Sequence, residues 1–280
     1  MASAGKLTGK KGLVTGSGTG IGREIALEFA RQGADVVLHY EHSERGASSA
    51  VEEIRTMGQR ATAFRANFQN TDEAVRLADR AIDFLGGIDC LVNNAGITMN
   101  RPFLKVTYVQ FDALMSVNVR SAFFVAQQVV KHMLEHGGGA ICNLTSIHGF
   151  QGAPEHSVYA ATKGAIIAYT RTLGIELAHR GIRVNAIAPG WITVEGHFKA
   201  QPGITAEEYE AAARNIVPVA RSGRPLDIAK LAAFLCSDEA EFIIGQTIIA
   251  DGGSTSLMSL MTDFRTESTA RFGTGYVPGI

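Results

Sequence analysis

The sequence predicts an α/β fold: a doubly wound parallel sheet of about seven strands with helices on both faces. Short apolar segments and segments of helical periodicity alternate six or seven times along the 280 residues. The predicted strands are apolar throughout instead of alternating with polar residues, which is typical of a parallel sheet buried on both faces. A glycine-rich turn, from Gly16 to Gly22, joins the first strand to the first helix.

The predicted strands are short apolar runs that end at turn-forming residues. In chain order they cover residues 11–14, 34–40, 61–66, 88–92, 140–145, 182–188 and 246–250.

The predicted helices fill the intervals between strands. The first has Ile21, Ile25 and Phe29 on one stripe, Ser43 is expected to cap the second, and Thr71 the third. Later helices are predicted at 108–135, 159–179, 205–214 and 226–236, with the rest of 191–216 irregular.

Composition favours one large globular domain, expected over residues 1–253, with 191–216 as a substrate-loop insertion and 254–280 as a C-terminal extension. Hydrophobic residues make up 46% of the chain, enough for a full core. The formal net charge is −1 without a basic block, which argues against nucleic acid or a membrane surface as the partner. The start of the chain has no apolar signal core, so we expect a cytoplasmic protein.

Tyr159 and Lys163 are four residues apart in an Ala-rich segment that predicts a helix, so their side chains share one face. A free tyrosine, with a pKa of roughly 10, is a poor acid–base catalyst near neutral pH. A neighbouring ammonium favours the phenolate and lowers that pKa. The pair is therefore suited to exchange a proton with an alcohol or a ketone, although the spacing alone also occurs by chance on surface helices.

Gly16, Gly20 and Gly22 lie between the first predicted strand and the first predicted helix. Small residues there let the backbone approach a pyrophosphate, and the helix N-terminus favours its negative charge. The spacing is G-x-x-x-G-x-G instead of the common G-x-G-x-x-G. Its place between a strand and a helix nevertheless favours a dinucleotide site.

Together, several motifs in order resemble the short-chain dehydrogenase/reductase family, including its glucose and other sugar dehydrogenases and its 3-oxoacyl reductases. The resemblance covers roughly residues 8–253 and is carried by Thr15-Gly-Ser-Gly-Thr-Gly-Ile-Gly22, Asn93-Asn-Ala-Gly96, Asn118, Ser146, Tyr159-x-x-x-Lys163 and Pro189-Gly190. It implies a Rossmann-type fold and an NAD(P)-dependent oxidoreductase. The reaction would interconvert a secondary alcohol and a ketone, or a sugar lactol and a lactone.

The resemblance also implies catalytic roles. Tyr159 would be the general acid in reduction and the general base in oxidation, and Lys163 would lower its pKa and bind the nicotinamide ribose. Ser146 would hydrogen-bond the substrate oxygen, and Asn118 would hold a water that relays protons to Lys163. All four residues are present, which favours an enzyme over a dinucleotide-binding protein that has lost turnover.

Cofactor contacts are implied for the glycine-rich turn, the ends of the second to fourth strands and the Pro-Gly segment. The residues are Gly16, Ser17, Thr19, Gly20, Ile21, Gly22, Tyr40, Glu41, Asn67, Phe68, Asn94, Ala95, Gly96, Tyr159, Lys163, Pro189, Gly190 and Ile192.

The sequence departs from the family pattern at the positions that distinguish NAD-preferring from NADP-preferring members. Tyr40 stands where NAD-preferring members usually have an aspartate, and Glu41 follows it; Thr19 stands where NADP-preferring members often have a basic residue. Two glutamates against Arg45 in residues 39–45 would repel a 2′-phosphate. The cofactor is therefore expected to be NAD or NADP, with NAD favoured. Further departures are Asn67 in place of an aspartate and Val194 in place of a threonine, with Thr193 one position early.

Three loops are expected to build the substrate side, namely those after Gly96, Ser146 and Pro189-Gly190. The candidate substrate residues are Ser146, His148, Gln151, His156 and Trp191, and the same loops offer Asn100, Arg101, Glu155, Glu195 and His197. A steroid or a long acyl chain would need a more apolar pocket, so a hydrophilic sugar or polyol is favoured, with a 3-oxoacyl-type reductase as the alternative. His148 and His156 are not at metal-ligand spacing, so no metal site is expected.

The resemblance implies a homotetramer, because members commonly pair the two long helices and the last strand across twofold axes. The predicted helices at 108–135 and 159–179 are more apolar than one-sided surface helices need to be. The family usually ends soon after the Asp-Gly-Gly at 251–253. The apolar residues of the extension, which lie between 257 and 276, predict that it packs on the protein, over its own substrate loops or across an interface.

Overall fold

The computed structural model describes residues 5–200 and 203–258. Within these ranges seven strands form one parallel sheet in the order β3-β2-β1-β4-β5-β6-β7. The bounds are Lys11–Val14 (β1), Asp35–Tyr40 (β2), Ala61–Arg65 (β3), Cys90–Asn93 (β4), Gly139–Leu144 (β5), Ile182–Pro189 (β6) and Thr247–Ala250 (β7). The predicted doubly wound Rossmann-type fold is confirmed, and each strand bound agrees with the prediction to within two residues.

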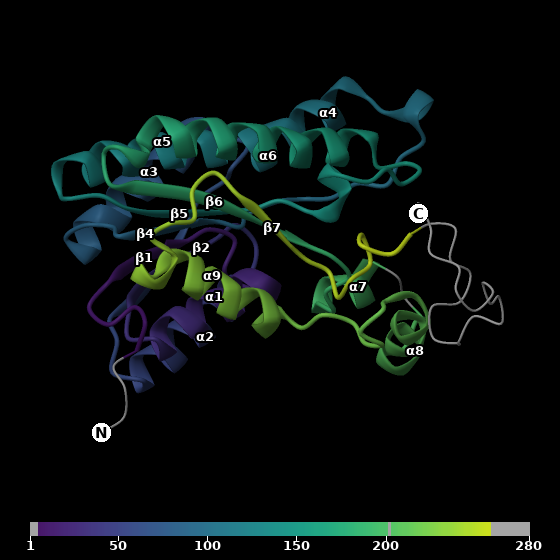
Figure 1. The fold of residues 1–280 in the computed structure, drawn as a ribbon, viewed down its shortest axis with the longest axis horizontal. Helices are drawn as coiled ribbons and strands as arrows, with labels where there is room; N and C mark the ends of the chain where they lie inside the picture. The colour runs from purple at the N-terminus through teal and green to yellow at the C-terminus, as the bar shows by residue number, and fades with distance from the viewer. Residues whose placement is uncertain (1–4, 201–202, 259–280) are drawn as a thin grey trace, which may run out of the picture.

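Helices cover both faces of the sheet (Figure 1). One face is covered by α1 (Gly20–Arg31), α2 (Glu44–Thr56) and α9 (Pro225–Cys236), and the other by α3 (Thr71–Leu85), α5 (Ser121–Glu135) and α6 (Ser157–Ala178). Each face has its own apolar core, with Phe29 fully buried in the first and Met133 in the second. Burial on both faces explains why the strands are mostly apolar, with a few buried polar residues such as His39, Asn143 and Asn185.

The helix predicted at 108–135 is interrupted. It consists of α4 (Tyr108–Met115), a π-helical turn at Ser116–Arg120 and then α5. The turn carries Asn118, and such turns often occur at functional sites. Apolar periodicity predicted one continuous helix here, because it does not distinguish a single π-helical turn within a helix.

The segment after β6 contains two helices where one was expected. The structure has α7 (Glu195–Ala200) and α8 (Ala206–Ile216). The second was predictable because Thr205 and Glu208 form a capping box. The short α7 was missed because it carries Gly196 and no apolar stripe.

Two predicted helix caps differ from the structure. Ser43 occupies the N-cap position of α2, but its side chain makes no capping hydrogen bond. The N-cap of α3 is Asn70 instead of Thr71, and its side chain accepts from the backbone N–H groups of Asp72 and Glu73. Asn70 has the extended backbone that a cap requires, whereas Thr71 is already helical.

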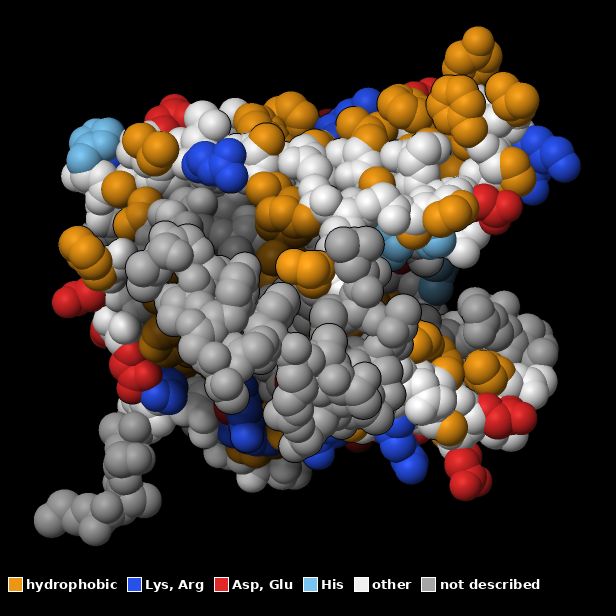
Figure 2. Space-filling model, turned by 45° about the vertical axis from the view of Figure 1, so that its right-hand side comes forward, with side chains coloured by type: hydrophobic (Ala, Val, Ile, Leu, Met, Phe, Trp, Pro, Cys, Tyr) orange, Lys and Arg blue, Asp and Glu red, His pale blue; other side chains and the backbone are white. Residues whose placement is uncertain are grey.

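The layer that contains α4 and α5 presents apolar side chains to solvent. Leu104, Tyr108 and Val109 are 92%, 91% and 78% exposed, and Phe123 on α5 is 44% exposed. Figure 2 shows hydrophobic side chains, in orange, gathered along the upper edge of the molecule. An exposed patch of this kind is typical of an interaction surface.

In the part of the chain that the structure covers, no helix combines the length and the hydropathy needed to cross a membrane. The predicted packing of the C-terminal extension falls mainly on residues 259–280, which lie outside the described residues. The division into a domain at 1–253 and an extension therefore stays a prediction.

Candidate active site

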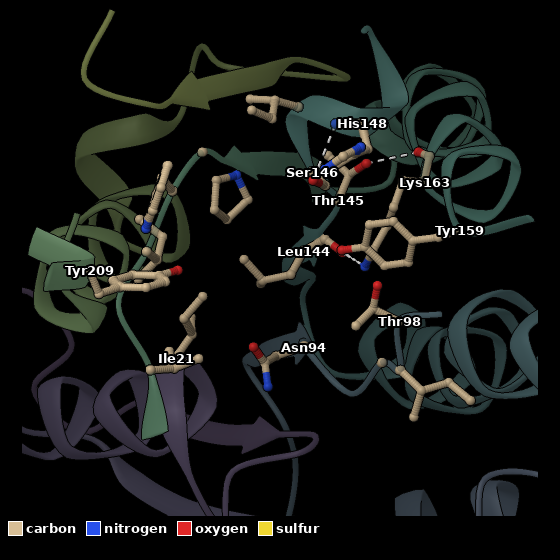
Figure 3. A pocket seen from close by; sticks show the side chains of 18 residues that line it. Ile21, Asn94, Thr98, Leu144, Thr145, Ser146, His148, Tyr159, Lys163 and Tyr209 are labelled. Carbon is tan, nitrogen blue, oxygen red and sulfur yellow. Dashed lines mark hydrogen bonds between the residues drawn. The ribbon is translucent and has the colours of Figure 1, made fainter. Parts of the chain in front are cut away.

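The predicted catalytic side chains meet at the carboxyl ends of β4, β5 and β6. Ser146 follows β5 by two residues, and Tyr159 and Lys163 lie one turn apart on α6. All three line a cavity of about 530 Å³, into which Figure 3 shows them pointing. Strand ends at one edge of a parallel sheet bring together residues that are distant in sequence.

Lys163 is buried, with only 5% of its surface exposed. Its Nζ donates to the carbonyl of Leu144 at 2.9 Å, and the hydroxyl of Thr145 donates to the carbonyl of Lys163 at 2.8 Å. Burial lowers the pKa of Lys163 to about 8, because an ammonium is poorly solvated there. A Cβ added at Gly96 would lie 3.6 Å from Nζ, so a small residue at this position leaves room for the ammonium.

The pKa of Tyr159 differs from the sequence-based expectation. Burial raises it, and a hydrogen bond with the side chain of Ser146 acts in the opposite direction. Lys163, which was expected to lower this pKa, directs its hydrogen bond to Leu144, with Nζ 5.6 Å from the centroid of the tyrosine ring. In this structure the burial of the phenol therefore outweighs any help from the ammonium.

Asn118 is buried below the site, in the π-helical turn. Its Nδ2 donates to the carbonyl of Ile97 at 2.9 Å and to Thr162 Oγ1 at 3.1 Å, and its Oδ1 accepts from Ile97 N at 2.8 Å. The side chain thus fixes the loop after β4 to α6. A water relay through Asn118 stays a prediction.

A second cavity, of about 380 Å³, runs from the glycine-rich turn to the end of β2. It shares Ile21, Asn94, Gly96, Ile97 and Val194 with the catalytic cavity, so the two form one groove.

The N-terminus of α1 opens onto this groove. Gly20 begins the helix with a φ of 58°, and the N-cap Thr19 makes no side-chain capping bond. The helix therefore presents backbone N–H groups and a positive dipole end without a side-chain cap, which fits a pyrophosphate. A dinucleotide thus suits the residues present, and the N-terminus of α1 would hold its phosphates.

Most predicted cofactor residues line this groove. Gly16, Thr19, Gly20, Ile21, Gly22, Tyr40, Glu41, Phe68, Asn94, Ala95 and Gly96 lie along the cavity that runs from the turn to the end of β2, and Tyr159, Lys163, Pro189, Gly190 and Ile192 lie along the catalytic cavity.

Two predicted cofactor residues face elsewhere. Ser17 is fully buried and donates its hydroxyl to the carbonyl of Val14. Asn67 closes its own turn, because its Oδ1 accepts from Gln69 N. Thr193 is likewise engaged away from the groove, in a hydrogen bond to Ser222, whereas Val194 lines it.

The predicted substrate residues divide into two groups. Ser146, His148 and Trp191 line the catalytic cavity. His156 stacks on His148 at 4.7 Å between ring centroids and lies edge-on to Tyr159 at 6.3 Å, outside the lining. Gln151 is exposed and does not line the cavity.

Sequence reasoning missed several residues that line the groove. They include His39 at the end of β2, Ile97 and Thr98 after β4, and Tyr209 on α8. Tyr209 contacts Trp191 edge-to-face at 5.0 Å between ring centroids. No sequence signal places α8 over the cavity, whereas His39 could have been noticed as a histidine in an otherwise apolar strand.

Among the described residues, no group of three His, Cys, Asp or Glu side chains could hold a metal ion. Cys90, Cys142 and Cys236 are buried free thiols.

A groove that leads from a glycine-lined helix N-terminus to a buried Ser–Tyr–Lys set defines a dinucleotide-dependent oxidoreductase. The chain belongs to the short-chain dehydrogenase/reductase family. A family profile described as "Enoyl-(Acyl carrier protein) reductase" matches residues 16–255. The family resemblance seen in the motifs is thereby confirmed.

Three similar proteins illustrate the range of this family. A 3-oxoacyl-[acyl-carrier-protein] reductase of Staphylococcus epidermidis is 39% identical over 244 residues, which cover 87% of this chain and 98% of the relative. A 7α-hydroxysteroid dehydrogenase, solved with NADH and 7-oxo-glycochenodeoxycholic acid, is 38% identical with a TM-score of 0.82, covering 88% of this chain and 94% of the other. A putative 2-deoxy-D-gluconate 3-dehydrogenase of Agrobacterium tumefaciens, solved with NADP, is 33% identical with a TM-score of 0.79, covering 90% and 98%.

The protein is therefore an NAD(P)-dependent oxidoreductase that acts on alcohol and ketone groups. Both NAD(H) and NADP(H) occur in similar structures, so the family does not decide between them.

Proposed function

We propose that Ser146, Tyr159 and Lys163 carry out proton transfer in the interconversion of a secondary alcohol and a ketone. The observation that carries this proposal is their common position around one cavity at the end of the dinucleotide groove. Ser146 holds the substrate oxygen beside Tyr159, and Tyr159 gives or takes its proton. The bound nicotinamide would supply or accept the hydride. Lys163 would meet the nicotinamide ribose, and its ammonium would help the tyrosine when the site is filled.

Within this class we propose a hydrophilic sugar or polyol as the substrate. Ser146, Thr98 and His148 give the cavity polar groups that suit several hydroxyls. The aromatic pair of Trp191 and Tyr209 offers a surface for the apolar face of a sugar ring. These features support a substrate whose ring bears hydroxyl groups on its edge.

A 3-oxoacyl-type reductase is the second candidate. Ile97, Leu144, Ile147 and Ile192 also line the cavity, and their apolar surface suits an acyl chain. The similarity to the Staphylococcus epidermidis reductase favours this candidate.

We also propose NAD as the preferred cofactor and a homotetramer as the assembly. Glu41 lines the groove at the end of β2 beside His42, and the described residues that line this cavity include no lysine or arginine. The exposed apolar side chains on α4 and α5, together with Ile175 on α6 at 71% exposure, support pairing of these helices between subunits. Light scattering coupled to size-exclusion chromatography measures the assembly, and a monomeric mass would contradict it.

The decisive experiment is an absorbance screen for reduced cofactor over sugars, polyols and β-keto esters, with NAD(H) and NADP(H) in parallel. Turnover of sugars or polyols supports the first substrate class, and reduction of β-keto esters alone supports the second. Tight binding of a dinucleotide without turnover of any substrate would favour a non-catalytic binding protein.

A further inference from the structure

The ring of His39 is buried where the glycine-rich turn, β2 and β3 meet. The residue is 3% exposed, and both of its ring nitrogens are hydrogen-bonded. The backbone N–H of Gly16 donates to Nδ1 at 3.0 Å, and Nε2 lies 3.0 Å from the carbonyl oxygen of Ala66. Because Gly16 can only donate here, Nδ1 is the acceptor and Nε2 carries the proton.

His39 also supports the wall of the groove. Its ring stacks on Phe68 with 4.0 Å between ring centroids and 11° between the planes, and both residues line the cavity between the glycine-rich turn and the end of β2. Its backbone N–H donates to Ser17 Oγ at 3.0 Å, and its carbonyl accepts from Ser17 N at 2.8 Å. His39 thus links the glycine-rich turn to the ring of Phe68, which lines the cofactor groove.

Gly16 is held on its other side by the segment that follows β4. Its carbonyl accepts from Asn94 Nδ2 at 2.9 Å, and a Cβ added to it would lie 2.7 Å from Ala95 Cα. Its φ of 62° is one that glycine adopts readily. The N–H of Gly16 belongs to the peptide whose carbonyl is that of Thr15, and this carbonyl also accepts from Asn94 Nδ2, at 3.0 Å. Asn94 thus holds the carbonyl end of this peptide, and the imidazole of His39 holds its N–H end.

We propose that His39 is a positioning residue for the dinucleotide cofactor, whose neutral imidazole sets the Gly16 peptide and the Phe68 ring. It acts through these two groups and not on the reacting atoms. Cofactor affinity should therefore require an acceptor at the position of Nδ1. A protonated ring would present a second N–H donor to the N–H of Gly16, and the bond would be lost.

The surroundings of His39 keep it neutral. Burial lowers its pKa to about 4, while the hydrogen bond to Ala66 acts in the opposite direction. The ring contacts just described are an amide N–H, a carbonyl and the phenyl group of Phe68, none of which titrates. The titratable or charged groups nearest to it in the sequence of these elements are Tyr40 at the end of β2, Glu41 after it, Arg65 at the end of β3, and Asp72 and Glu73 at the start of α3. The acceptor is thus present at neutral pH.

Two variants test the two ring nitrogens of His39 one at a time. In His39→Asn the amide oxygen can take the place of Nδ1, so the Gly16 bond is kept. In His39→Gln the amide can reach Ala66 instead, and the Gly16 N–H loses its acceptor. Both variants remove the ring that stacks on Phe68, so the difference between them reports on Gly16. Val37→Ala, a fully buried position on the same strand, is the control for general loss of stability.

The test is the dissociation constant of NAD and of NADP, measured by calorimetry without substrate. We expect His39→Gln to weaken the better-bound cofactor about tenfold, and His39→Asn to stay within about threefold of the wild type, in line with the loss of one buried hydrogen bond. With saturating cofactor, kcat should change less than about twofold in all variants. Below about pH 5 the wild-type dissociation constant should rise more steeply than that of His39→Asn, which does not titrate.

Several results would overturn the proposal. Equal weakening by the Asn and Gln variants would exclude the acceptor at Nδ1 as the cause. If His39→Gln and Val37→Ala weaken cofactor binding equally, His39 has only a structural role. If His39→Gln does not fold, parallel pH dependences of the wild type and His39→Asn would still reject the proposal.

Discussion

The Nζ of Lys163 lies 5.6 Å from the centroid of the Tyr159 ring and donates to the carbonyl of Leu144 at the end of β5. The lysine therefore fixes α6 to the sheet beside the tyrosine whose proton the reaction uses. Burial favours the neutral form of both side chains, because it lowers the pKa of Lys163 and raises the pKa of Tyr159. Each of these groups gives a distinct prediction.

Tyr159→Phe should bind the cofactor like the wild type and lose at least about a hundredfold in kcat, because general acid–base catalysis contributes roughly that much or more. The ring remains, while the transferable proton is removed. Cofactor binding by calorimetry and steady-state turnover measure the two effects. Tyr209→Phe is the matched control, since it alters another tyrosine of the cavity and should change KM more than kcat. Turnover near the wild-type rate in Tyr159→Phe would remove Tyr159 from the acid–base role.

Lys163→Met should stabilise the cofactor-free protein at pH 7 while it weakens cofactor binding and turnover. The folded-state pKa of about 8 lies below the ordinary value of 10.5, so the buried ammonium costs stability below pH 8. That cost is at most roughly 3 kcal/mol, less the contribution of the lost Leu144 hydrogen bond. As pH rises from 8 to 10.5, the wild type should gain stability and the difference should shrink.

Chemical denaturation of both proteins across this range measures the change. A difference in stability that is independent of pH would contradict the burial of a charged lysine. Turnover by the variant should also need a higher pH, because the tyrosine loses its neighbouring ammonium.

Gly22→Ala and Gly164→Ala should have opposite effects on stability. A Cβ at Gly22 would lie 2.3 Å from both Asn94 Nδ2 and the carbonyl oxygen of Gly16, so the turn must shift. We expect a loss of about 1–3 kcal/mol and weaker cofactor binding. A Cβ at Gly164, inside α6, meets nothing within 4 Å and should stabilise the helix by about 0.5–1 kcal/mol. Thermal unfolding compares the pair, and a stable Gly22→Ala with normal affinity would contradict the tight packing of the turn.

The cofactor preference should favour NAD, because Glu41 lines the groove where a 2′-phosphate would lie. Glu41→Gln should improve kcat/KM for NADP relative to NAD by removing this repulsion. Arg45→Ala should impair NADP use more than NAD use if the guanidinium reaches the phosphate. A wild-type preference for NADP beyond about a hundredfold, or about 2.7 kcal/mol, would contradict this assignment.

Local sequence patterns were sufficient for much of the fold, and together with the family resemblance they gave the candidate catalytic residues. Strands that are buried on both faces are mostly apolar, so β4 and β5 are visible as apolar runs. Each also contains one buried asparagine, Asn93 and Asn143, and the two side chains hydrogen-bond to each other. Spacing alone places Tyr159 and Lys163 on one face of α6. The glycines of the first turn identify a dinucleotide groove, because only small residues allow the backbone to approach a phosphate.

The tertiary structure decided what depends on contacts between distant segments. Burial raises the pKa of Tyr159 and the hydrogen bond with Ser146 lowers it, and the spacing to Lys163 indicates neither effect. Tyr209 reaches the cavity because α8 folds over it, and His39 meets Gly16 because β2 ends beside the turn. Sequence periodicity reports which face of an element is apolar, whereas desolvation and hydrogen bonding depend on which other elements pack against that face.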